Sequence, residues 1–328
     1  YRFEPVSQTE IRYGLGAIKG SGEAAIGAIV AEREANGPFK GLFDLARRVD
    51  KRYLNRRVLE ALVKAGAFDS LNDHRASLMA SIAAALDTAD RAARGGGQVG
   101  LFGEELGGSG EELIDAPRWP DQEKLLQEKS ALGYYFSGHP FTAYVSEVSS
   151  FAKKHLASLE PSRELTILAG IAVSLRTQMT RRGKMVIVLL DDATAQVEVA
   201  VFNELFEQHR HLLREDALLV IEGKVNRDDY SGGLRVTAER IYGLAEARTR
   251  FAQGLRITCN GQSSGVKLNE LLAPYKADSG GCPVWVEYCN RAARCQVRLG
   301  ESWRVRLDDR LLESLGDWLK PESVAVVY

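Results

Sequence analysis

The chain has 328 residues, of which 45% are hydrophobic and 27% are charged, and its formal net charge is −1. This length suffices for two or three globular domains, and the near-zero charge excludes a strong whole-chain field, although local basic patches can still bind nucleic acid. No apolar run is long enough to cross a bilayer, and the first residues, YRFEPVSQTE, contain neither Met nor an apolar signal segment, so we expect a piece of a longer protein with no membrane association.

Residues 10–94 are predicted to be helical, and two helix-like runs in IRYGLGAIKGSGEAAIGAIVAERE are joined by KGSG. Gly20 and Gly22 permit unusual backbone angles in this turn, so the second helix can present its free N–H groups and positive dipole end to a phosphate. Lys19 adds a positive charge. The pattern indicates a helix-hairpin-helix motif, which binds DNA without sequence preference. The alternative is a glycine turn between two purely structural helices.

A basic run follows the first hairpin. Between residues 40 and 64 there are eight basic and three acidic residues. Arg52, Arg56 and Arg57 lie in its centre and are predicted to contact the phosphate backbone of duplex DNA; a solvated charged surface is the alternative. LNRRVLEALVKAGAF resembles a second, degenerate hairpin that lacks the G-x-G turn, so residues 1–94 are interpreted as a tandem helix-hairpin-helix domain.

Residues 95–120 form a predicted flexible linker that is rich in glycine and acidic residues. Its stretch QVGLF at 98–102 places two bulky apolar residues in a segment that cannot build its own core. These residues either pack back onto the chain or bind a partner through a Q-x-x-L-F peptide, formed by Gln98, Val99, Gly100, Leu101 and Phe102. A helical connector is predicted over 121–162.

From residue 163 to 245 the pattern changes to five segments rich in Val, Ile and Leu, with one helical insert between the third and the fourth. This order predicts an OB-fold β-barrel, because a β-sandwich usually has more strands and no such helix. OB-folds bind single strands through basic and aromatic side chains. The candidates are Arg176, Arg181, Arg182, Lys184, Phe202, Lys224, Arg227, Tyr230 and Arg235. A barrel that only bridges two domains is the alternative.

Residues 246–328 are predicted to form a small α+β domain, which makes the chain a multi-domain α+β protein. None of the four cysteines (Cys259, Cys282, Cys289 and Cys295) forms a C-x-x-C pair, so we expect reduced thiols in a cytoplasmic protein rather than a zinc site. The paired carboxylates Asp191–Asp192 and Asp228–Asp229 lie in predicted turns at strand ends. We therefore expect no catalytic residue and no metal site in this chain.

The chain resembles the C-terminal region of the alpha subunit of bacterial DNA polymerase III, the C-family replicative polymerase. IRYGLGAIKGSGE, LNRRVLEALVKAGAFD, QVGLFG, LGYYFSGHP and DDATAQVEVAVF carry the resemblance in the family's order. It implies that residues 98–102 bind the ring-shaped sliding clamp, the hairpins hold duplex DNA, the barrel contacts single-stranded template and residues 246–328 bind the clamp-loader tau subunit. It also implies an upstream polymerase active site that uses Mg²⁺, whereas this part has no cofactor and is inert alone.

Two other interpretations remain open. NAD-dependent DNA ligases combine a barrel with helix-hairpin-helix units, but a ligase fragment would need a K-x-D-G lysine and usually a four-cysteine zinc site. A stand-alone OB-fold protein that binds single-stranded DNA or acts as a scaffold would need neither the hairpins nor the QVGLF peptide. Sealing of nicked DNA with ATP or NAD would reveal a ligase, and competition between duplex and single-stranded DNA would reveal a pure single-strand binder.

Overall fold

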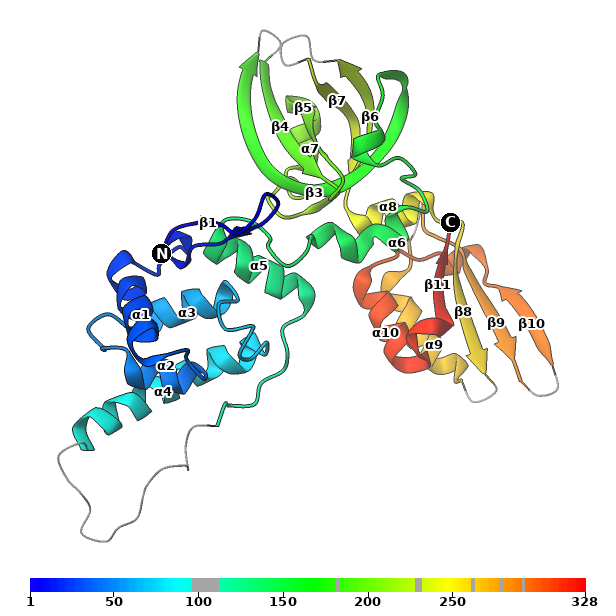
Figure 1. The fold of residues 1–328 in the computed structure, drawn as a ribbon. Helices are drawn as coiled ribbons and strands as arrows, with labels where there is room; N and C mark the ends of the chain where they lie inside the picture. The colour runs from blue at the N-terminus through cyan, green and yellow to red at the C-terminus, as the bar shows by residue number, and fades with distance from the viewer. Residues whose placement is uncertain (96–111, 181–182, 228–231, 261–262, 278–279, 291–292) are drawn as a thin grey trace. The chain divides into compact units, whose positions relative to one another are not determined.

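The computed structural model describes residues 1–95, 112–180, 183–227, 232–260, 263–277, 280–290 and 293–328 (Figure 1). The chain divides into two compact units, Tyr1–Pro140 and Phe141–Tyr328. No helix in the described residues is both long and apolar enough to span a membrane.

The first unit is mainly helical. It begins with a short hairpin of β1 (Glu4–Pro5) and β2 (Ile11–Arg12) and a 3-10 turn, η1 (Leu15–Ala17). The helices are α1 (Glu23–Asn36), α2 (Leu42–Arg48), α3 (Arg56–Lys64), α4 (Arg75–Gly95) and α5 (Asp121–Leu132).

The predicted helix before KGSG is wrong, because this stretch folds as β2 and η1. Gly14 and Gly16 explain the difference. Both lie under the first two residues, where a Cβ on Gly14 would be 2.4 Å from the Arg2 backbone and one on Gly16 would be 2.2 Å from the Tyr1 ring. Glycine also lowers helix propensity by about 1 kcal/mol relative to alanine. The turn at Gly20 is therefore preceded by one 3-10 turn rather than by an α-helix.

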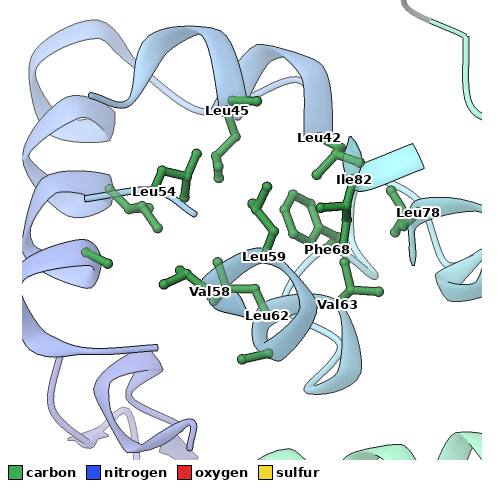
Figure 2. Close-up of a cluster of buried hydrophobic side chains, with 14 of the residues drawn as sticks. Leu42, Leu45, Leu54, Val58, Leu59, Leu62, Val63, Phe68, Leu78 and Ile82 are labelled. Atoms are coloured by element: carbon green, nitrogen blue, oxygen red, sulfur yellow. The ribbon is translucent and has the colours of Figure 1, made fainter. Parts of the chain in front are cut away.

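The core of the first unit lies between α1, α2, α3 and α4 (Figure 2), and Ile26 of α1 is completely buried in it. In α3 the apolar residues recur at helical spacing, and Leu59 and Val63 are completely buried. They meet Leu42 of α2 and Ile82 of α4 in the same cluster. This packing fixes the N-terminal ends of α1 and α3, where the predicted phosphate contacts lie.

The second unit contains a closed barrel. Its elements are β3 (Ser162–Thr180), β4 (Gly183–Asp191), β5 (Gln196–Phe202), α7 (Asn203–His209), β6 (Leu218–Arg227) and β7 (Leu234–Tyr242). The strands close in the order β3-β4-β5-β7-β6, and among the described pairings within the barrel only β5–β7 is parallel. The predicted five strands, with a helix between the third and the fourth, are confirmed.

The second unit ends in a sheet with helices on one face. Its elements are α8 (Leu244–Phe251), β8 (Gly254–Asn260), α9 (Gly265–Leu272), β9 (Val284–Cys289), β10 (Arg294–Arg298), α10 (Asp309–Leu319) and β11 (Val324–Val327). The strand order is β10-β9-β8-β11. Leu255 and Ile257 of β8 pack against Leu272 of α9 and Leu311 and Leu315 of α10. The predicted α+β character of this part is confirmed.

Residues 121–162 do not form one connector, because their side chains pack in different units. Ala131 and Leu132 of α5 join the core of the first unit. The short helix α6 (Val145–Val148) belongs to the second unit, where Val148 packs with Ala247 of α8.

An ion cluster around the buried side chain of Arg248 ties the second unit together. Arg248 of α8 pairs with Glu147 of α6 and Asp309 of α10, and the Tyr328 hydroxyl donates to Glu147 Oε1 at 2.6 Å. Burial disfavours the charged guanidinium, but the two carboxylates outweigh it and raise the pKa of Arg248. The cluster links the segment before the barrel to the segment after it.

Candidate nucleic-acid interface

The turn before α1 is shaped by two glycines and a buried serine. Gly20 and Gly22 have φ angles of +90° and +73°. Ser21 between them is 1% exposed, and its hydroxyl donates to the carbonyl oxygens of Ile18 at 2.8 Å and Leu15 at 3.2 Å. Residues other than glycine rarely adopt such φ values. The two glycines therefore allow the chain to fold over Ser21 and enter α1 directly.

The N-terminus of α1 is open. Gly22 provides no side-chain cap, and the first backbone bond of the helix runs from the Ile26 N–H to the Gly22 carbonyl at 3.2 Å. The N–H groups before Ile26 therefore have no acceptor in the helix, and the helix dipole adds partial positive charge at the same place. The negative charge of Glu23 in the first turn disfavours binding of an anion here, whereas the free N–H groups favour it.

Arg57 lies next to this turn. A Cβ on Gly20 would be 3.5 Å from Arg57 Nε, so the guanidinium reaches the turn from the start of α3. Arg57 is exposed, and its side chain has no hydrogen bond or ion pair within the described residues. A cation in the first turn of a helix is unfavourable, and an anion bound between α1 and α3 would compensate it.

The other predicted duplex contacts are arranged differently. Arg52 pairs with Asp50 at 2.6 Å, and Arg56 pairs with Glu60 at 2.7 Å, so neighbours neutralise both cations. Lys19 Nζ would lie 3.3 Å from a Cβ on Gly133, at the C-terminal end of α5. The structure thus brings Gly20, Gly22 and Arg57 together, while Lys19, Arg52 and Arg56 point to other partners.

The second, degenerate hairpin is closed by its own side chains. Gly66 follows α3 with φ +77°, but a Cβ there would be 2.3 Å from Arg75 Nη2. Arg75 is 4% exposed and pairs with Asp69 at 2.6 Å and with completely buried Glu128 at 2.9 Å. A protein cation therefore fills this turn, which leaves no room there for a phosphate.

On the barrel, strand register gathers several predicted residues on the outer face. One row across four strands runs from Arg176 through Ile187 and Ala200 to Thr237, next to Lys224 of β6. The neighbouring rows carry Phe202 beside Met185, and Arg235 beside Glu198. We call the outward side chains of Arg176, Phe202, Lys224 and Arg235 the barrel face. Its aromatic ring is 37% exposed and available for stacking.

Carboxylates moderate the charge of the barrel face. Glu198 accepts from Arg176 at 2.5 Å and from Arg235 at 3.0 Å, and these arginines lower its pKa. Lys224 pairs with Glu239 at 2.8 Å. Our sequence reasoning missed Glu198, although its position between Val197 and Val199 indicates an outward side chain.

Two predicted residues lie elsewhere on the barrel. Lys184 has the inward parity of Val186 and Val188, and its ammonium lies over the Phe206 ring of α7 at 4.8 Å. Arg227 ends β6 opposite Leu234, with the inward parity of Val225. The remaining candidates, Gln98 to Phe102, Arg181, Arg182 and Tyr230, lie outside the described residues.

The carboxylates at the end of β4 stabilise a turn. Asp192 is 4% exposed and accepts from the backbone N–H groups of Leu156 at 2.8 Å and Thr194 at 2.9 Å. Burial favours its neutral form, but these hydrogen bonds outweigh burial and lower its pKa. In the ranges that the structure describes, no group of three or more His, Cys, Asp or Glu residues could hold a metal ion. Asp228 and Asp229 are not described.

Three family models match the chain. Residues 1–78 match the "Helix-hairpin-helix motif", residues 167–244 the "OB-fold nucleic acid binding domain", and residues 267–319 the "DNA polymerase III subunit alpha, C-terminal domain". The tandem hairpin region and the barrel predicted from sequence therefore correspond to nucleic-acid-binding families.

Curated relatives match along the whole chain. DNA polymerase III subunit alpha of Neisseria meningitidis serogroup A is 41% identical over 330 residues, which cover 99% of this chain and 29% of the relative. The subunits of Pseudomonas aeruginosa and Escherichia coli (strain K12) are 37% and 38% identical and match 100% of this chain. The chain spans 29 to 30% of the length of these relatives. It therefore belongs to the family of bacterial DNA polymerase III alpha subunits, in which it corresponds to a C-terminal region.

Proposed function

We propose that the chain is the non-catalytic, DNA-holding part of a replicative DNA polymerase. The complete protein would be a DNA-directed DNA polymerase whose Mg²⁺-dependent active site lies outside this region. In this region the first unit holds duplex DNA, and the barrel face holds single-stranded template. The similarity to DNA polymerase III alpha subunits over 99% of the chain supports this assignment.

One observation carries the duplex proposal: Arg57 reaches the glycine turn that opens the N-terminus of α1. Backbone N–H groups, a helix dipole and a guanidinium there meet a phosphate without reading bases. Such contacts give affinity that falls with salt and does not depend on sequence.

The test compares duplex binding by the parent, R57E and R33E. Arg33 is exposed in the last turn of α1, the helix that follows the glycine turn. At the helical rise of 1.5 Å per residue it lies about 15 Å from that turn. We expect R57E to weaken duplex binding and to flatten its salt dependence, and R33E to bind as the parent does. Equal binding by R57E and the parent would remove the phosphate site from this turn.

The barrel proposal is tested in the same way. R176E/R235E reverses two arginines of the barrel face, and R163E reverses an exposed arginine nearer the start of β3. We expect only the double variant to lose affinity for single-stranded DNA. If both variants bind as the parent does, the barrel is a spacer between its neighbours.

We also propose that Gln98 to Phe102 bind the sliding clamp and that residues 246–328 bind the clamp-loader tau subunit. The apolar pair in QVGLF, within a segment rich in glycine and acidic residues, supports the first contact. The second contact is proposed because residues 267–319 match the C-terminal domain of DNA polymerase III subunit alpha. Titration against the clamp should show binding by the parent and none by Q98A/F102A, and binding to tau should be unchanged in that variant.

A further inference from the structure

The sheet of β8 to β11 leaves one face open. In β8, Leu255, Ile257 and Cys259 are buried beneath the helices, whereas Arg256 and Asn260 on the other face are exposed. Both α9 and α10 pack on the first face, as the labelled helices beside the sheet show (Figure 1). The open face is therefore a solvent-facing platform across four strands.

Strand register places an aromatic ring between two cations on this platform. Trp285 of β9 lies directly between Arg256 of β8 and Arg298 of β10. Its six-membered ring lies over Gly254, where a Cβ would be only 2.8 Å from the ring. Gly254 therefore leaves room for the indole to extend across β8, and the side chain remains partly exposed.

The charge on the platform is mostly positive. The side chain of Arg256 has no hydrogen bond or ion pair among the residues that the structure describes. Arg298 is 58% exposed and pairs with Glu301 at 3.2 Å, outside the strand, while Arg294 pairs with Glu287 at 3.0 Å. Within the four strands, three arginines face one carboxylate on this side.

We propose that this surface, the Trp285 face (Arg256, Trp285, Arg294 and Arg298), binds single-stranded nucleic acid at a site separate from the barrel. A partly exposed aromatic ring between arginines suits an unpaired base and its flanking phosphates, because the base stacks on the ring and the guanidinium groups neutralise the backbone. A sheet of four strands is also wide enough for a splayed strand, whereas a closed duplex offers no base plane to stack on Trp285.

Tryptophan fluorescence tests the site on the whole chain. The probe is a short oligo(dT) at low salt, and the variants are W285F, W285A, R256E/R298E and R310E. Arg310 is exposed on α10, in the helix layer, and provides the matched charge control. Each variant is also prepared in the R176E/R235E background, so that failure of the barrel proposal and failure of this one are distinguishable.

We expect oligo(dT) to quench the parent. W285F should bind within about twofold of the parent, because its ring still stacks, but it should lose the part of the quenching that Trp285 supplies. W285A should weaken binding at this site by about 5- to 150-fold. R256E/R298E should lower the salt slope by roughly 1.4, since each single-strand phosphate contact contributes about 0.7. R310E should behave as the parent, and all these differences should persist in the R176E/R235E background.

Three results would overturn the proposal. Equal quenching of the parent and W285F would show that Trp285 does not meet the oligonucleotide. An equal loss in R310E and R256E/R298E would show that only net charge matters. Quenching of Trp285 by poly-glutamate but not by oligo(dT) would assign the face to an acidic protein instead.

Discussion

Replacing Glu128 with alanine is expected to lower the free energy of unfolding of the first unit by more than a substitution of an exposed residue does. Glu128 is completely buried, and one carboxylate oxygen accepts from Arg75 Nη1 at 2.9 Å. The other accepts from the backbone N–H groups of Phe136 at 2.9 Å and Ser137 at 2.8 Å. Burial favours the neutral acid, but these donors outweigh it and lower the pKa of Glu128. The carboxylate therefore stays charged and joins α5 to the second hairpin.

The magnitude follows from what E128A leaves behind. Breaking a buried ion pair by removing one partner costs about 3–5 kcal/mol, because the other charge is left uncompensated. Asp69 still pairs with Arg75, which favours the lower end, while two backbone donors lose their acceptor, which favours the upper end. With a urea dependence of about 2 kcal/mol per molar, the midpoint should fall by roughly 1.5 to 2.5 M.

The two units need separate readouts, since a chain with several domains does not unfold in two states. Trp119 is the only tryptophan within Tyr1–Pro140, and it packs against the core of the first unit. The ¹⁹F signal of fluorotryptophan at this position therefore follows the first unit alone. R118A, which breaks the exposed Arg118–Asp73 pair, should leave the midpoint unchanged. A parent-like midpoint for E128A would refute the reasoning.

Three further outcomes are expected. G22A should destabilise the first unit by about 1–3 kcal/mol in urea titrations and weaken duplex binding in anisotropy titrations, because φ +73° with ψ 140° is almost restricted to glycine. A G22A variant with the stability and duplex affinity of the parent would contradict this role of Gly22. Because the pKa of Asp192 is lowered in the folded state, its contribution to barrel stability is present above the unfolded pKa of about 3.9 and is lost as the pH falls through the folded pKa. The urea midpoint should therefore fall less steeply between pH 5 and pH 2 in D192N than in the parent. Ellman's reagent at pH 8 should modify the exposed thiols of Cys289 and Cys295 quickly and the buried thiols of Cys259 and Cys282 only on unfolding, since burial also raises the pKa of Cys282 to about 11. Four thiols that react equally fast would contradict the burial of Cys259 and Cys282.

The barrel could be predicted because local pattern determines its strands. Alternation such as Val197, Glu198, Val199 indicates one buried and one exposed face, and turn residues separate the segments. The ion pairs on the barrel face could not be predicted in the same way. Glu198 meets Arg176 and Arg235 through register between strands that are far apart in sequence, and one residue of slip would exchange the two faces.

The hairpin region shows a second limit of sequence reasoning. The glycine turn and its unusual backbone angles were predicted from the G-x-G motif, and the positive φ angles of Gly20 and Gly22 agree with it. The helix expected before it did not form, because Gly14 and Gly16 accommodate the first two residues of the chain. Likewise, Arg75 fills the turn of the second hairpin, where it pairs with Glu128, a residue 53 positions later in the sequence. Tertiary contacts of this range leave no periodic signal in either segment.

The ion cluster at Arg248 bears on how this region can be divided for experiments. A cut at residue 245, where composition places the end of the barrel, would remove Arg248 and leave Glu147 without its main cation. It would also remove Ala247, which packs with Phe141 and Val148. A truncated barrel would thus expose an apolar patch and an unneutralised carboxylate, and it would precipitate for reasons unrelated to its binding properties. Expression from Phe141 to Tyr328 keeps the cluster complete.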